Sequence, residues 1–167
     1  MSNYRQIFIA LLMLVTTSVI GQPSQSSISR VLGEVNALRA RGCNCGDTYM
    51  LPAPPLRWNL KLYDISKQYA QYLHRNNHFS HTTKDGKTLA DRLDQVGYKW
   101  TQIGENLGQG YNDFYAVFDA WITSPSHCKM LMNPSVTDFG MSKYYDCLLY
   151  TSPSPRDRTR SRMPSSA

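Results

Sequence analysis

Four cysteines, Cys43, Cys45, Cys128 and Cys147, constrain the fold of this 167-residue chain more than any other residue type. A single residue separates Cys43 from Cys45, so a bond between these two would close a strained ring. The spacing therefore favours a bridge from Cys128 to Cys43 or to Cys45, which would tie two distant parts of the chain together. A redox or zinc role for Cys43-Asn44-Cys45 is not favoured, because both roles usually have two residues between the cysteines.

Residues 1–21 have the parts of a secretory signal peptide. Arg5 lies in a short polar stretch, an apolar run covers residues 7–15, and the expected cleavage position follows Gly21. The run is shorter than the roughly 20 apolar residues that span a bilayer; an uncleaved membrane anchor is the alternative. No later stretch approaches that length, so we expect no membrane span in the mature chain. Secretion to an extracellular or periplasmic location would permit disulfides.

Residues 147–167 differ in composition from the rest of the chain, because Ser, Pro, Thr and Arg dominate them. Such a segment cannot bury a core, so we expect it to be disordered. Residues 147–157 look like translated sequencing adapter, and we therefore expect the native sequence to end near Asp146.

The tail and the signal peptide also carry much of the positive charge. The tail has four arginines and one aspartate, and Arg5 adds one more charge, so the net charge of +6 falls to +2 for the remaining domain. The lysines and arginines of that domain are scattered, whereas a nucleic-acid site needs a basic stripe on one face. We therefore expect no nucleic-acid partner.

Apolar residues at helical spacing, with capping residues at their ends, predict four helices, and a Ser-Pro start signal predicts a short fifth one. Their expected bounds are residues 27–41, 59–77, 89–96, 113–122 and 124–133. The expected caps are Ser26 or Ser27 for the first helix, Asn59 for the second and Asn112 or Asp113 for the fourth, and Gly42 is expected to end the first. Residues 98–107 are expected to form a strand or an extended segment, and residues 139–145 a strand. A strand at the end of the native sequence implies a partner strand beyond it.

Three histidines, His74, His78 and His81, have spacings of four and three residues, which would place them on one face of a continuous helix as potential metal ligands. However, Asn76 and Asn77 indicate that the helix ends before His78. We therefore expect His81 to take part in a site and His74 to lie on the surface, and leave His78 open. The alternative is that these histidines only bind the free carbonyls at a helix end.

Glu105 lies between Gly104 and Asn106 in an apolar and aromatic stretch. A buried carboxylate needs partners. Beside His81 it could orient the imidazole, bind a metal or act as a general base, whereas structural hydrogen bonds to loop amides are the alternative. His127 is expected in the first turn of the fifth helix, where the helix N-terminus favours the neutral, metal-binding imidazole.

These motifs occur in an order that resembles the CAP superfamily (cysteine-rich secretory, antigen 5 and pathogenesis-related proteins, SCP domain) in its bacterial secreted form. Phe79-Ser80-His81, Gly104-Glu105-Asn106 and Ser124-Pro125-Ser126-His127-Cys128 carry most of the resemblance. The other matching positions are residues 41–46, 55–59, 85–86, 97–98 and 132–134, with Arg92 and Trp121.

The resemblance implies an α+β fold, a three-layer α-β-α sandwich with a central antiparallel sheet, over residues 27–146 and truncated at its C-terminal end. It also implies a surface cleft in which His81, Glu105 and His127 are the candidate ligand-binding residues. In some members this cleft binds a divalent metal, so the same three residues are the candidate ligands for zinc. Of the further cleft residues of eukaryotic members, one glutamate would fall near Ser124, and one histidine lies in a final strand that has no counterpart here.

Two functions follow from this resemblance. The first is a secreted module that binds an extracellular partner, a lipid or another small molecule at the cleft. The alternative is a metal-dependent hydrolase in which Glu105 or a histidine activates water; a cell-envelope interaction domain with a structural cleft is a third possibility. A serine hydrolase is not favoured, because Ser126 lacks the Gly-x-Ser-x-Gly context of such enzymes.

Overall fold

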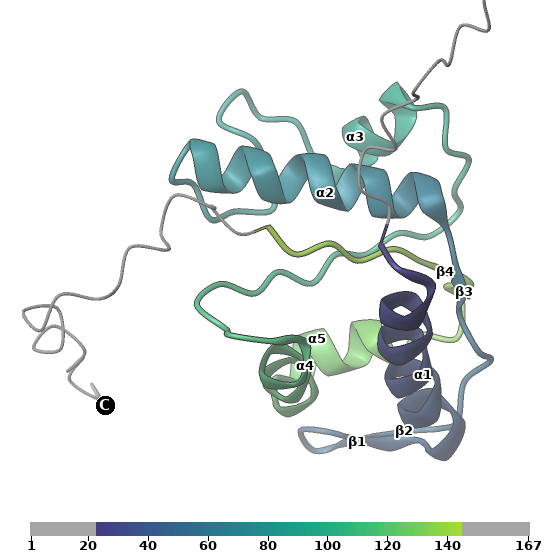
Figure 1. Cartoon of the computed structure of the whole chain (residues 1–167). Helices are drawn as coiled ribbons and strands as arrows, with labels where there is room; N and C mark the ends of the chain where they lie inside the picture. The colour runs from purple at the N-terminus through teal and green to yellow at the C-terminus, as the bar shows by residue number, and fades with distance from the viewer. Residues whose placement is uncertain (1–22, 145–167) are drawn as a thin grey trace, which may run out of the picture.

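The computed structural model describes residues 23–144 of the chain (Figure 1). The expected signal peptide at residues 1–21, Cys147, the expected end of the native sequence near Asp146 and the tail at residues 147–167 therefore lie outside the described residues. No helix within residues 23–144 has the combined length and apolar character needed to cross a membrane.

The described residues form five helices, in the order and close to the positions that the sequence predicts. They are α1 (Gln25–Arg41), α2 (Leu60–Arg75), α3 (Leu89–Gln95), α4 (Phe114–Thr123) and α5 (Pro125–Leu131). The predicted caps of α2 and α4 are confirmed, since the Asn59 side chain accepts hydrogen bonds at the start of α2 and Asp113 does so at the start of α4. Gly42 ends α1 as predicted, with φ of 70°.

The start of α1 was predicted wrongly by two residues. Ser24, not Ser26 or Ser27, is the cap, and its hydroxyl accepts a hydrogen bond from the backbone N–H of Ser27. Three serines in four positions offer equivalent hydroxyls, so the sequence alone does not choose among them. The end of α5 was also placed too late, because the helix stops at Leu131.

The strands in the described part of the chain are short. The strands β1 (Cys43–Cys45) and β2 (Thr48–Met50) form an antiparallel hairpin, whereas β3 (Arg57–Trp58) pairs in parallel with β4 (Asp138–Phe139). The strand β3 ends at Trp58, because Asn59 caps α2 directly after it, so β4 can pair with β3 over two residues only. This explains why the strand expected over residues 139–145 pairs only at its start.

The α+β class is confirmed, while the central antiparallel sheet of a three-layer sandwich stays a prediction. Residues 98–107 form no paired strand with the described residues. Figure 1 nevertheless shows this segment and residues 138–144 running between α2 on one side and α4 and α5 on the other. The approach to α2 is close, because a Cβ atom at Gly140 would lie 2.3 Å from the backbone nitrogen of Tyr63.

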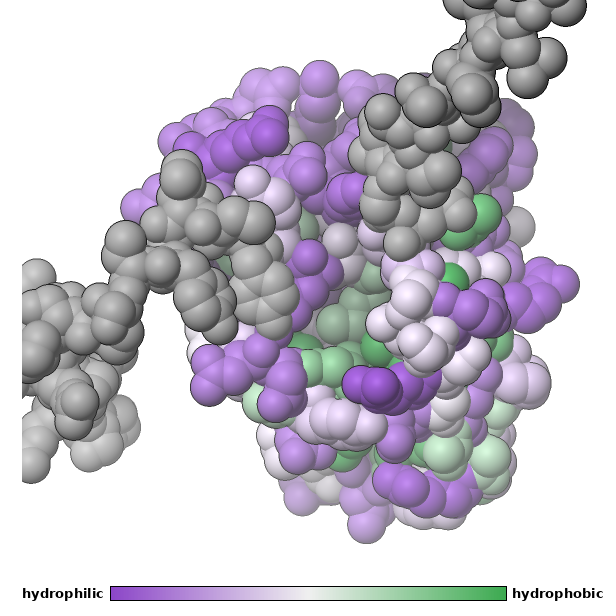
Figure 2. All heavy atoms as spheres, in the orientation of Figure 1, coloured by the Kyte–Doolittle hydropathy of each residue, from purple (hydrophilic) through white to green (hydrophobic). Residues whose placement is uncertain are grey.

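The core lies where α1, α4, α5 and the hairpin meet. It comprises Val35, Leu38, Cys45, Leu56, Val117, Phe118, Trp121, Cys128, Leu131 and Met132. The predicted apolar faces of α1 and α4 thus pack together, and the Trp121 indole donates a hydrogen bond to the Leu107 carbonyl at 2.9 Å. Figure 2 shows apolar residues in the recess in the middle of one face, framed by hydrophilic residues.

A disulfide between Cys45 and Cys128 joins the hairpin to α5. This bond decides between the two pairings that the sequence left open. Cys43 remains a thiol within the described part of the chain. Burial raises the pKa of this thiol, and the charge of Arg41 opposes that shift.

Arg39, which was not predicted to be buried, is fully buried on the apolar face of α1. Its guanidinium donates hydrogen bonds to the carbonyl oxygens of Pro54, Leu131, Asn133 and Val136, at 2.6 to 3.4 Å. Burial lowers the pKa of Arg39. One side chain thereby connects α1 to the proline-rich loop before β3 and to the segment that follows α5.

Candidate functional site

The site begins with the pair formed by His81 and Glu105. The Nδ1 atom of His81 lies 3.0 Å from Oε1 of Glu105, although 24 residues separate them in sequence. A carboxylate oxygen accepts hydrogen bonds, so Nδ1 carries the hydrogen and Nε2 remains available to a ligand. The His81 side chain is 59% exposed and that of Glu105 is 17% exposed, so the histidine faces solvent and the carboxylate lies deeper.

Arg92, from α3, holds the second oxygen of the same carboxylate. Its Nη2 donates to Oε2 of Glu105 at 2.6 Å, and its side chain is only 9% exposed. Its guanidinium carbon also lies 3.3 Å from the centroid of the Tyr69 ring, a cation–π geometry. The ion pair therefore fixes the orientation of the Glu105 carboxylate, whose other oxygen is bound to His81.

Tyr69 connects this arrangement to the backbone of the histidine segment. The Tyr69 hydroxyl, whose pKa is raised by burial, donates a hydrogen bond to the Ser80 carbonyl at 2.7 Å. Arg92 also donates to the His81 carbonyl at 3.4 Å. The position of α3 itself depends on a capping box between Thr88 and Asp91. Side chains from α2 and α3 thus fix the loop that carries His81.

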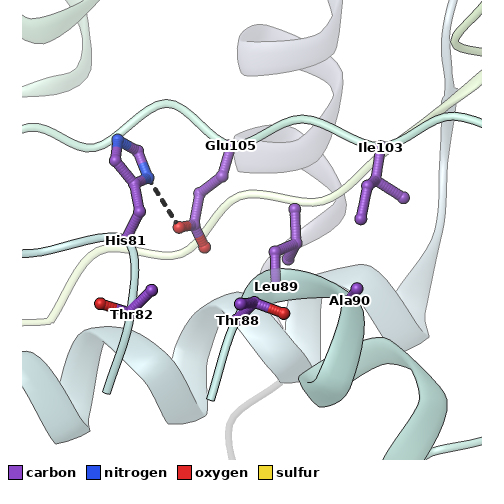
Figure 3. Close-up of a pocket in the computed structure, with 7 residues that line it drawn as sticks. All are labelled: His81, Thr82, Thr88, Leu89, Ala90, Ile103 and Glu105. Atoms are coloured by element: carbon purple, nitrogen blue, oxygen red, sulfur yellow. Dashed lines mark hydrogen bonds and ion pairs between the residues drawn. The ribbon is translucent and has the colours of Figure 1, made fainter. Parts of the chain in front are cut away.

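A cavity of about 460 Å³ adjoins the His81–Glu105 pair. Its lining consists of His81, Thr82, Thr88, Leu89, Ala90, Ile103 and Glu105. Figure 3 shows His81 and Glu105 reaching toward each other from two segments, with Leu89 between Glu105 and Ile103. One end of the cavity is therefore polar, and the part next to it is apolar.

His127 does not lie beside His81 and Glu105 at the cavity, as it would have to if the three residues bound one ligand. Its Nδ1 atom bonds to the Ser124 hydroxyl at 2.9 Å, and the residue does not line the cavity. The connection to the cleft is through the backbone, since the Asn106 side chain donates to the His127 carbonyl at 3.1 Å. Successive side chains of an extended segment point to opposite faces, so Glu105 turns toward α3 and Asn106 toward α5.

This arrangement does not suit a zinc ion held by His81, Glu105 and His127. Both oxygens of Glu105 already have partners, and one of these is the positive charge of Arg92. Within residues 23–144, the one group of three potential ligands whose donor atoms all lie within 4.8 Å of one another is Cys43, Cys45 and Cys128. Metal binding at the cleft therefore stays a prediction without geometric support.

The other two candidate histidines, His74 and His78, lie outside the cavity lining. The helix α2 ends at Arg75, before His78, as predicted from the paired asparagines. The Nε2 atom of His78 lies 2.8 Å from the Thr82 carbonyl, and the ring of His74 packs beside that of Tyr144. Neither residue joins His81 at the cavity.

Sequence reasoning gave Arg92 no role, although a signal for it exists. Leu89, Arg92, Leu93 and Val96 have the spacing of one helix face, so the arginine lies on the apolar side of α3. A charged residue there requires a buried partner of opposite charge. Glu105 meets this requirement, since it is an acidic residue in the mostly apolar segment that follows α3.

Removing the charge of Glu105 is expected to lower the stability of the domain. In Glu105→Gln, the buried guanidinium of Arg92 loses its counter-charge, and we expect a loss of about 2 kcal/mol in the free energy of unfolding. His81→Ala removes an exposed partner, so it should cost less than about 1 kcal/mol. Urea denaturation of both variants measures the difference. Equal losses would contradict the assignment of Arg92 as the main partner of Glu105.

Comparisons with known proteins agree with the fold and the motifs. Among curated proteins, the chain is 32% identical over 93 residues to the uncharacterized membrane protein YlbC of Bacillus subtilis (strain 168). It is 26% identical over 87 residues to the uncharacterized protein YkwD of the same strain. These matches cover 54% and 52% of this chain but only 27% and 34% of the relatives, so the chain spans about a third or less of their length.

Two solved structures share the fold. One is an extracellular protein containing an SCP domain from Bacillus anthracis str. Ames, with a TM-score of 0.61, 24% identity, and coverage of 74% of this chain and 41% of that one. The other is an outer surface protein from Borrelia burgdorferi, with a TM-score of 0.59, 24% identity, and coverage of 71% of this chain and 81% of that one. The family model for CAP, the cysteine-rich secretory protein family, matches residues 32–151. The chain therefore belongs to the CAP family.

Proposed function

We propose that this protein is a secreted CAP domain that binds an extracellular ligand at the cavity beside His81 and Glu105. The observation that carries the proposal is the cavity of about 460 Å³, which has a polar pair at one end and apolar side chains next to it. Small-molecule sites typically have volumes of about 300–1,000 Å³ and combine apolar walls with a few placed polar groups.

The lining indicates the chemistry of the ligand. Leu89, Ala90 and Ile103 suit an apolar group, while Nε2 of His81 and the hydroxyl of Thr82 suit a polar one. A lipid-like molecule with one polar end combines both features. The carboxylate of Glu105 serves this site by orienting His81, because its own oxygens are occupied by His81 and Arg92.

His127 supports the same site indirectly in this proposal. Its carbonyl holds the Asn106 side chain and so fixes the segment that carries Glu105. A metal-dependent hydrolase is not proposed, because the carboxylate that would take a proton from water is held between His81 and the positive charge of Arg92.

The proposal has two further parts, secretion and the central sheet. Secretion is supported by the predicted signal peptide at residues 1–21 and by the Cys45–Cys128 disulfide, which suits an oxidising compartment. We also propose that residues 98–107 and 138–144 belong to the central antiparallel sheet of a three-layer α-β-α sandwich. Their place between α2 and the pair α4 and α5 supports this (Figure 1).

Palmitate is the first probe for this function, since it has a long apolar chain and one polar end. We expect calorimetry to give a Kd near 1 µM, about −8 kcal/mol. Leu89→Asn places an amide in the apolar part of the cavity and should weaken binding about tenfold or more. Tyr49→Ser, on the exposed face of the hairpin, is the control and should leave binding unchanged.

The outcomes separate the proposal from its alternatives. Absence of palmitate binding, or equal affinity for the parent and Leu89→Asn, would refute a lipid-like ligand at this cavity. Zinc alone is titrated in a parallel experiment. Micromolar zinc binding that both His81→Ala and Glu105→Ala abolish would instead support the predicted metal site.

A further inference from the structure

Three cysteine sulfurs lie together where the hairpin meets α5. The thiol of Cys43 lies 3.6 Å from Sγ of Cys128 and 3.9 Å from Sγ of Cys45, while the latter two are bonded to each other. Because Cys43 is similarly far from both sulfurs, it approaches the disulfide from the side. In-line attack on the bond therefore requires the Cys43 or Cys128 side chain to turn.

The strand geometry explains why two cysteines face the same partner. Cys43 and Cys45 are two residues apart in β1, so their side chains lie on the same face of the strand. Pairing with β2 fixes that face, with Cys43 opposite Met50 and Cys45 opposite Thr48. Both sulfurs consequently point toward α5, where Cys128 is fully buried.

We infer that Cys43, Cys45 and Cys128 form a thiol–disulfide exchange site with two alternative disulfides. In the exchange, the thiolate of Cys43 attacks Sγ of Cys128, and a Cys43–Cys128 bond forms. The Cys45–Cys128 bond breaks, and Cys45 leaves as a thiolate that takes up the proton which Cys43 released. The step conserves one disulfide and one thiol, so it needs neither an oxidant nor a reductant.

The packing of the hairpin decides which disulfide predominates. The two bonds close loops of nearly equal length, so chain entropy does not distinguish them. Changing partners requires the sulfurs of Cys43 and Cys128 to close from 3.6 Å to a bonding distance of about 2 Å, which shifts β1 relative to α5. That shift would disturb the contact between Gly46, which has a φ of 64°, and the ring of Pro125, where a Cβ would lie 3.0 Å away. The Cys45–Cys128 form is therefore the major one, and Cys43–Cys128 is a minor form that becomes dominant when Cys45 is removed.

The first test removes the resident partner. The full chain carries Cys147→Ser in every sample, so that Cys147 cannot form a bond of its own. Cys45→Ser is purified without reductant, checked for folding by circular dichroism, denatured, alkylated with N-ethylmaleimide and mapped by mass spectrometry. We expect a peptide pair joined through Cys43 and Cys128 in most molecules. Alkylation of both cysteines in folded protein would overturn the inference.

A second measurement does not depend on the folding of that variant. The Cys147→Ser protein with all three remaining cysteines is held overnight in mildly alkaline buffer, since uncatalysed disulfide rearrangement takes minutes to hours. After an acid quench, it is denatured and alkylated, and fragment ions locate the label. We expect the label on Cys45 in about 1 molecule in 100 or more, as for a minor state. Label on Cys43 alone would overturn the inference. Cys43→Ser is the matched control, in which neither remaining cysteine should be labelled.

Discussion

Cys128→Ser is expected to lower the free energy of unfolding by about 4–5 kcal/mol, according to the chain-entropy model of a disulfide that closes a loop of this length. The bond joins residues separated by 83 positions, so its loss frees a large part of the unfolded chain. It also leaves a serine hydroxyl at a fully buried position. Because Cys128 is the common partner in both alternative disulfides, this variant removes either bridge.

Urea denaturation of the full chain, with Cys147→Ser in the background, measures this effect. Cys43→Ser is the matched control, because it changes a neighbouring cysteine and keeps the Cys45–Cys128 bond; its stability should change by less than about 1 kcal/mol. Adding a reductant to the parent should reproduce most of the loss seen in Cys128→Ser. A loss below about 1 kcal/mol in Cys128→Ser would mean that the bridge contributes little to the fold.

Arg39→Met is expected to lower the free energy of unfolding by about 3–4 kcal/mol. Methionine has a similar length but no donor, so the four carbonyl groups that Arg39 binds would lose their partner. Each unsatisfied buried acceptor costs about 1–3 kcal/mol, partly offset where water can enter and by the burial of an apolar side chain. The segment after α5 and the loop before β3 should both loosen from α1.

Two comparison variants separate the hydrogen bonds from the positive charge. Arg39→Lys keeps the charge, but one ammonium group cannot reach four carbonyls in different directions, so it should be almost as destabilising as Arg39→Met. Arg30→Met, at an exposed position on the same helix, should change stability by less than about 0.5 kcal/mol. Full stability in Arg39→Lys would show that charge, rather than hydrogen-bond geometry, matters at this position.

The helices were predictable because their signals are local. The caps Asn59 and Asp113 and the stop at Gly42 act within one turn of the residues that they affect. The strands were less predictable, because a strand depends on a partner from elsewhere in the chain. The segment at residues 98–107 has an extended path, but no local signal states whether another strand lies within hydrogen-bond distance.

The candidate site was predictable in part for the same reason. Motifs identified His81 and Glu105, and the structure brings them together. His127 was predicted in the same cleft, yet its imidazole bonds to Ser124, which directly precedes its own helix. Arg92 was not assigned a role, because its importance depends on two partners, Glu105 and Tyr69, that come from other segments.

The sequence by itself determined the helices, the α+β class, the set of cysteines that could pair and the two residues, His81 and Glu105, that the structure brings together. Each of these follows from spacing, capping or motif, which are properties of neighbouring residues. Only the tertiary structure decided that Cys45 rather than Cys43 bonds to Cys128. It also decided that Arg39 donates hydrogen bonds to backbone carbonyls in the core, and that Arg92 forms an ion pair with Glu105. The physical reason is that disulfides, buried ion pairs and buried hydrogen bonds depend on distances of a few ångströms between segments far apart in the chain, which local preferences do not specify.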